Sequence, residues 1–164
     1  MLSVLCESQF PSPESVSFVK TVLDDSKIPY LYSSGNHDWH YEGLPGSSEA
    51  LRAEWRAKSL TPLYNGRNPS HWSEDTPSGL RFIAIDNSTY QVDAEQLAFF
   101  KEHAAGDKPV VLLVHIPLCV DALQETLLAR FDGDHAGRGV GLCGDPRWGT
   151  ATDNGWETEQ RPQW

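Results

Sequence analysis

The spacing of hydrophobic residues changes from a helical to a strand-like period before residue 35. Ser12 is suited to cap a helix, and Pro13 fits the first helical position, where a missing backbone N–H does no harm. The apolar residues that follow lie on one helical face and are Val16, Val19, Val22 and Leu23. After this helix the run IPYLYS predicts a short buried strand that ends at Gly35.

A second helix is predicted from Ser47 to about Lys58, because Leu51 and Trp55 are four residues apart and share one helical face. Residues 59–78 contain Pro, Gly, Asn and Ser throughout, which predicts a long loop. The chain up to this loop is therefore expected to form a helix, a strand and a second helix.

Two apolar stretches in the following part of the chain predict buried strands. The stretch LRFIAID, which ends at Asp86, has too many apolar residues for a strand with one wet face, and we expect it to be central. The stretch PVVLLVHI, residues 109–116, has the continuous Val and Leu run of a strand buried on both faces. Asp93 and Gln96 have capping-box spacing and predict a helix between these strands, and Asp121 is expected to cap another.

This order of helices and strands indicates an α/β fold with helices layered on a largely buried sheet. We expect the fold to occupy residues 1–131, with residues 132–164 forming an irregular tail or loop, because they contain Gly, Asp and Trp without hydrophobic periodicity. The sequence begins without the basic and apolar regions of a signal peptide, and no segment approaches the ~20 apolar residues of a membrane span. These absences leave the compartment open, the cytoplasm included.

Charge excludes some partners. The 164 residues include 13 Lys and Arg against 23 Asp and Glu, a formal net charge of −10. Nucleic acids and anionic membranes require basic surface, so neither is an expected partner, whereas carboxylates are compatible with a metal site. The three cysteines, Cys6, Cys119 and Cys143, have no zinc-site spacing, and we expect them to be buried or incidental thiols.

Polar residues follow the predicted strands at the point where each one ends. Residues 35–38, the GNHD block, follow the first strand; Asp86 and Asn87 end the second; and a lone His115 ends the third. Functional groups of open α/β sheets gather at the carboxyl ends of the strands. We therefore expect these residues to lie near one another.

The residue types in this group can bind a metal and move protons. Gly35 allows a sharp turn and a close approach of the backbone to a ligand. The amide oxygen of Asn36 is a hard neutral ligand for Mg²⁺ or Mn²⁺, and His115 adds a nitrogen that suits a transition metal. His37 can hold or donate a proton near neutral pH, and a carboxylate such as Asp38 beside it favours the protonated form.

This group of residues resembles the calcineurin-like metallophosphoesterases. That family has a Gly-Asn-His-Asp/Glu block after a strand and, downstream, a strand that ends in a lone His, often followed by Pro; here these are the GNHD block and VVLLVHIP ending at His115. The connection between them, IAIDNS followed by the helix AEQLAFFKEH, is similar to that of the family. The resemblance covers about residues 11–118.

The resemblance implies a layered αββα sandwich and a metal-dependent phosphoesterase that hydrolyses a phosphomonoester or a phosphodiester. In the family, two divalent ions (Mn, Fe, Zn or Mg) clamp the phosphate ester for attack by a metal-bound hydroxide. By this analogy Asn36 and His115 would bind the second metal, His37 would protonate the leaving oxygen, and Asp38 would orient His37.

Three further blocks of the family pattern are absent from the sequence. Neither an Asp-x-His block nor a Gly-Asp-x-x-Asp/Asn block stands in the 34 residues before Gly35, and no Gly-His-x-His block follows His115. Asn36 and His115 are then the only family metal ligands present, and one amide oxygen with one imidazole rarely holds a hard divalent ion without carboxylates. We therefore expect a fragment of a phosphoesterase domain, incomplete at both ends, that is weak or inactive alone.

Simpler interpretations remain open for each of these residues. The GNHD block has the composition of an ordinary strand-end turn, and His115 on its own is typical of a core histidine. Asp86 and Asn87 are expected to serve in a turn, and Trp39 to pack. The competing functions are a degenerate, non-catalytic α/β interaction module and an unrelated α/β protein in which GNHD is coincidental.

Overall fold

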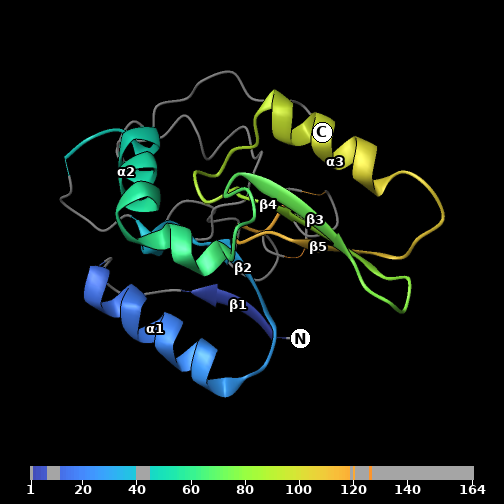
Figure 1. Ribbon diagram of the computed structural model, residues 1–164. Coiled ribbons are helices and arrows are strands. Elements are labelled where there is room, and N and C mark those ends of the chain that lie inside the picture. Colours follow the sequence, from blue (N-terminus) through green and yellow to red (C-terminus); the bar gives the residue numbers. More distant parts are fainter. Residues whose placement is uncertain (1, 7–11, 40–44, 119, 121–125, 127–164) are drawn as a thin grey trace.

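The protein is a mixed α/β structure in a computed structural model that describes residues 2–6, 12–39, 45–118, 120 and 126 (Figure 1). Its main elements in chain order are β1 (Leu2–Cys6), α1 (Pro13–Ser26), β2 (Tyr30–Ser34), α2 (Ser48–Trp55), β3 (His71–Asp75), β4 (Arg81–Ile85), α3 (Ala94–Ala104) and β5 (Val110–Leu113). Short helical turns follow β2 (η1, Asn36–Asp38) and α2 (η2, Arg56–Leu60; η3, Thr61–Tyr64).

The strands form two sheets. The first contains β1 and β2, which run parallel with Leu2 opposite Tyr30. The second has the order β3-β4-β5, in which β4 pairs antiparallel with β3 and parallel with β5. The prediction that LRFIAID forms a central strand is confirmed, because β4 has a neighbour on both sides.

Alternate side chains of the strands face different layers of the structure. On β2, Tyr30 and Tyr32 pack with residues of α1, α2, η2 and η3, whereas Leu31 packs with Trp72 and Ala84 of the second sheet. On β4 the residues on either side of Ala84, Ile83 and Ile85, are buried and pack against α3. This period-2 alternation places α1 and α2 on one side of the strands and α3 on the other (Figure 1).

Local sequence signals set the ends of α1 and α3. The Ser12 hydroxyl accepts a 3.0 Å hydrogen bond from the backbone of Ser15, and Pro13 opens α1 as predicted. Asp93 and Gln96 form the predicted capping box, with each side chain accepting a hydrogen bond from the other residue's backbone N–H. Such caps satisfy N–H groups that have no partner inside the helix.

Two segments differ from the predictions around the second helix. The α-helix ends at Trp55 and continues as a π-helical turn and a 3₁₀ turn to Tyr64, so the helical conformation extends beyond the boundary predicted near Lys58. The predicted loop over residues 59–78 was also wrong in its second half, which contains β3. Gly79, at φ 84°, belongs to the turn that joins β3 to β4, a conformation that favours glycine.

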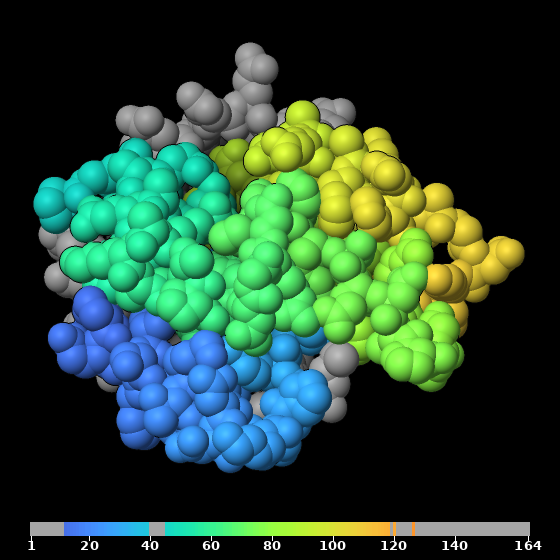
Figure 2. Space-filling model, viewed as in Figure 1, coloured from blue at the N-terminus to red at the C-terminus, as the bar shows by residue number. Residues whose placement is uncertain are grey.

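Predictions of burial failed at two places. β5 was expected to be buried on both faces, yet Val110 and Val111 are 36% and 37% exposed, because among the described residues β5 pairs only with β4. On α1 the buried face contains Val16 and Leu23, whereas Val22 is 51% exposed. Figure 2 shows α1 along one margin of the visible face, beside the residues of η2.

The remaining predictions concern the two ends of the chain. The predicted order began with a helix, and β1 corrects this by adding a parallel strand beside β2. The helix expected after Asp121 and the tail over residues 132–164 lie outside the described residues. No helix in the described ranges is long and apolar enough to cross a membrane.

Candidate functional site

The carboxyl ends of β2, β4 and β5 meet at one place. The Asn36 side-chain oxygen Oδ1, just after β2, lies 2.9 Å from Nε2 of His115, just after β5, although the two residues are 79 positions apart in sequence. The Ser34 hydroxyl donates a 2.9 Å hydrogen bond to Asp86 at the end of β4. The predicted proximity of the strand ends is therefore confirmed.

Gly35 is required by space and not by backbone conformation. Its φ of −94° and ψ of 166° are open to any residue. A Cβ at this position would lie 2.8 Å from Cε1 of His115 and 3.1 Å from Nε2. The imidazole thus packs directly over the Gly35 backbone. The expected close approach of this backbone to a ligand stays a prediction.

Asp38 is buried and stabilises the turn that carries Asn36 and His37. Its Oδ2 accepts hydrogen bonds of 2.9 Å from the backbone N–H of Gly35 and from the hydroxyl of Tyr32. The side chain is inside the protein, at 2% exposure, whereas the neighbouring His37 is exposed. This arrangement presents His37 to solvent from a turn whose backbone is held by a carboxylate.

Trp39 attaches the same turn to the loop after β4. It is fully buried, and its indole Nε1 donates a 2.9 Å hydrogen bond to the hydroxyl of Ser88. The side chain also belongs to the core that surrounds α1 and α2. The prediction that Trp39 serves in packing is confirmed.

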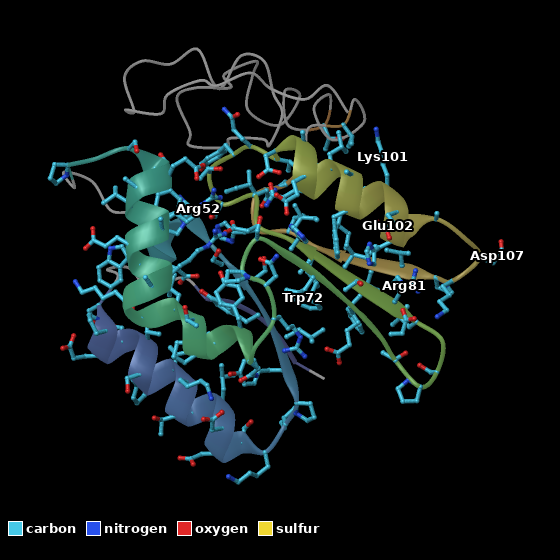
Figure 3. The ribbon with its side chains drawn as sticks, turned by 45° about the horizontal axis from the view of Figure 1, so that its top comes forward. Arg52, Trp72, Arg81, Lys101, Glu102 and Asp107 are labelled. Carbon is cyan, nitrogen blue, oxygen red and sulfur yellow. The ribbon has the colours of Figure 1, made fainter. Side chains whose placement is uncertain are left out.

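Asp86 is surrounded by hydrogen-bond donors and positive charge. One oxygen accepts from the backbone and hydroxyl of Ser88, and the other from Ser34 and from the guanidinium of Arg56. Arg52 extends from α2 toward the same carboxylate, with Nη1 3.8 Å from Oδ2 (Figure 3). The prediction of a turn role is confirmed, and this carboxylate is already matched by arginine.

Burial and the charge of Asp86 shift the pKa values of Arg56 and Tyr64. Burial, the largest single influence, lowers the pKa of the Arg56 guanidinium, but Asp86 and Tyr64 together raise it above its ordinary value. Burial, and then the negative charge of Asp86, raises the pKa of the Tyr64 hydroxyl, because both disfavour a phenolate. The polar cluster beside Asn36 is thus organised around a neutral Tyr64 and an Arg–Asp ion pair.

Asn87 was predicted only as a turn residue, but it also supports His115. Its Oδ1 accepts hydrogen bonds of 3.0 Å from the backbone N–H of both His115 and Ile116, and its Nδ2 donates a 2.6 Å bond to the Ile116 carbonyl. An Asn at a strand end is so common in turns that the sequence alone carries no signal for this longer-range contact.

The positions of Asn36 and His115 fit one metal ion. Two ligand atoms bound to one ion at about 2.1 Å and at right angles are about 3.0 Å apart, close to the 2.9 Å observed. Both ligands are neutral, however, and within the described residues no group of three or more His, Cys, Asp or Glu side chains could hold a metal ion. The described site therefore provides two adjacent ligand positions.

No protein-family model, no curated protein and no solved structure matches this chain.

Proposed function

We propose that this chain carries part of the active site of a metal-dependent phosphoesterase. The observation that supports the proposal is the 2.9 Å approach of Asn36 Oδ1 and His115 Nε2, which come from the ends of two different strands. A shared metal ion would account for one ligand atom from a turn and one from a distant strand end meeting at the same point. The expected substrate is a phosphomonoester or a phosphodiester.

In this proposal Asn36 and His115 hold one divalent ion of the Mn, Fe, Zn or Mg type. Such an ion, when bound, polarises a phosphoryl oxygen and lowers the pKa of a bound water. The exposed His37 donates a proton to the leaving oxygen of the ester, since it stands next to Asn36 and faces solvent. Asp38 acts on His37 by holding the turn through Gly35 and Tyr32.

We further propose that the two sheets are part of a layered αββα sandwich. Three apolar clusters support this order: one joins α1 and α2 to β2, one joins β2 to β3 and β4, and one joins β4 and β5 to α3. In such a sandwich, two sheets face each other and helices cover their outer faces. The ligand positions then lie at the rim where both sheets end.

The number of ligands limits what this chain can do alone. The other ion of a dinuclear site needs carboxylates and histidines from the three sequence blocks that residues 1–164 do not contain. Two neutral ligands bind a hard divalent ion weakly. We therefore infer a fragment of a phosphoesterase domain that shows little or no turnover by itself.

A degenerate, non-catalytic interaction module is the second candidate. The observation in its favour is that Asn36 and His115 satisfy each other through a direct hydrogen bond, which stabilises the rim without any metal. The two proposals differ in whether a divalent ion binds at Asn36 and His115 and whether phosphate strengthens that binding.

The decisive experiment measures Mn²⁺ binding by electron paramagnetic resonance, with and without inorganic phosphate. We expect weak binding of one ion that is tightened by phosphate and lost in both Asn36→Ala and His115→Ala. The matched control is His103→Ala, which removes a partly buried histidine on α3 whose ring nitrogen contacts the Phe99 carbonyl. Mn²⁺ binding that persists in both site variants, or whose affinity is unchanged by phosphate, would favour the non-catalytic module.

Hydrolysis of p-nitrophenyl phosphate with added Mn²⁺ provides the second test. We expect residues 1–164 to show little or no turnover. Rapid turnover that is abolished by His37→Ala would show that the described ligands suffice, and would contradict the inference that half of the site is missing.

A further inference from the structure

We infer that Asn87 is a positioning residue: it fixes the chain after β5 so that the His115 imidazole meets Asn36. This inference rests on the proposed function for its metal-binding consequence. The positioning itself depends only on contacts between described residues.

Asn87 acts where the backbone pairing of two strands stops. The β4–β5 ladder ends with Ala84 opposite Leu113, so His115 and Ile116 lie beyond it. The side chain of Asn87, three residues after Ala84, takes over from the backbone of β4 as the hydrogen-bond partner of the chain that follows β5. Its Oδ1 accepts from both of these backbone N–H groups at 3.0 Å.

Only one orientation of an amide satisfies all three contacts. Nδ2 of Asn87 donates to the Ile116 carbonyl at 2.6 Å while Oδ1 receives the two N–H groups. A flipped amide would turn its NH₂ toward two donors and its oxygen toward a carbonyl. Asn87 is fully buried, so water cannot replace these bonds.

The His115 ring is then held from three sides. Asn87 fixes the backbone that carries it, the Gly35 backbone lies under its face, and Asn36 meets its Nε2. Removing the first support leaves the ring to be placed by the other two alone. Groups that orient a metal ligand in this way typically change metal affinity by about 10- to 100-fold when they are altered.

The test compares Asn87→Asp, Asn87→Ser and Asn87→Ala with a matched control. Asn87→Asp keeps the shape of the side chain and the acceptor Oδ1 but loses the Nδ2 donor to Ile116. Asn87→Ser shortens the side chain, and Asn87→Ala removes both the acceptor and the donor. The control is Gln96→Ala, because Gln96 is another buried amide that binds backbone carbonyls, those of Ser70 and Asp86, without contacting His115.

The first measurement needs no metal. We expect faster amide exchange at His115 and Ile116 in Asn87→Ser and Asn87→Ala, which shorten or remove the side chain whose Oδ1 accepts from these N–H groups. The NMR signals of the His115 ring and the Asn36 side-chain amide should move toward the values that each shows when the other is replaced by Ala. Gln96→Ala should leave these signals in place. Unchanged His115 and Asn36 signals in folded Asn87→Asp and Asn87→Ser would overturn the inference, whatever their stability.

The second measurement is the Mn²⁺ dissociation constant, compared at equal folded fraction. We expect about a 10- to 100-fold increase for Asn87→Ser and none for Gln96→Ala. Equal affinity in the wild type and the Asn87 variants would overturn the role in metal binding. If the wild type itself binds no Mn²⁺ through Asn36 and His115, the proposed function fails, and the metal-free signals still decide whether Asn87 positions the ring.

Discussion

Replacing Gly35 with alanine isolates the packing of the His115 imidazole from every other feature of the turn. The backbone of Gly35 has φ −94° and ψ 166°, which alanine adopts without strain. The added Cβ would lie 2.8 Å from Cε1 and 3.0 Å from Nδ1 of the ring. Any loss of stability therefore reports on the ring and not on the turn.

The expected magnitude follows from these distances. Carbon atoms in contact are separated by about 3.5–4.0 Å, so the ring must retreat by roughly 0.7 Å or more. Overpacking of this kind costs about 1–3 kcal/mol. A retreat that breaks the bond to Asn36 adds about 0.5–1.5 kcal/mol. We expect Gly35→Ala to lower the free energy of unfolding by about 2–4 kcal/mol.

A double-mutant cycle with His115→Ala measures the coupling. With the ring removed the Cβ has room, and the alanine should be neutral or stabilising by about 0.4–1 kcal/mol through the unfolded chain. Urea unfolding of the four proteins should then give a coupling energy of at least about 2 kcal/mol.

Gly79→Ala serves as the control for this cycle. Gly79 has φ 84° and nothing within 4 Å of its virtual Cβ, so its substitution is penalised by conformation alone. It should cost the same with and without His115. If Gly35→Ala also costs the same in both backgrounds, the ring does not rest on the glycine and the site geometry argued above is wrong.

Three further predictions concern pH and packing. The folded-state pKa of Tyr64 lies above its usual 10.0, chiefly through burial. The contribution of Tyr64 to the free energy of unfolding is therefore intact below about pH 10 and is lost as the pH rises further. Tyr64→Phe should flatten this alkaline decline of the unfolding free energy, measured with urea. The pKa of Asp75 is lowered below 3.8 by hydrogen bonds from Arg81 and Lys108, so its contribution to the free energy of unfolding is present above that pH and lost below it. Asp75→Asn should remove a small, salt-sensitive part of the fall in unfolding free energy at acid pH. Trp39→Phe should destabilise by about 1–3 kcal/mol in thermal unfolding, since it removes a buried hydrogen bond and part of a fully buried ring.

The parts of the fold that the sequence predicted well are set by nearby residues. The helix caps at Ser12 and Asp93 use side chains that bond to backbone groups three residues away, and both form as expected. The strand at residues 30–34 was visible as an apolar run, and all five of its residues are buried. Local chemistry is sufficient for the caps because their partners lie within one turn of the chain. The strand was predictable because its own sequence is apolar, although its partners are distant.

The strand β3 was missed because its stability comes from a distant partner. Its sequence, HWSED, is polar, and only Trp72 of its five residues is buried. The ladder with β4 and the packing of Trp72 on Leu31 and Ala84 hold it in place (Figure 3). Charged pairs across the hairpin, such as that of Arg81 with Asp75, add exposed contacts that no hydrophobic pattern reveals.

The candidate site divides in the same way. Asn36, His37 and His115 were identifiable because their side chains have metal-binding or proton-transfer chemistry and stand at strand ends. The residues that place them, above all Asn87, are chemically ordinary and act on partners 28 and 29 positions away. A motif identifies the reactive groups, whereas their support becomes visible only in three dimensions.

The charge at the rim can be judged only from the structure as well. The chain has a formal charge of −10, which would favour cations anywhere near it. The buried carboxylate at the end of β4, Asp86, is nevertheless matched by Arg56 and approached by Arg52. The pairing with arginine therefore offsets the negative charge that this carboxylate would lend to the two neutral ligands, and breaking it would leave the partly buried guanidinium of Arg56 without its partner. On the proposed function, tight metal binding at this rim requires further carboxylates, and residues 1–164 lack the three sequence blocks that would supply them, which is why the expected affinity is low.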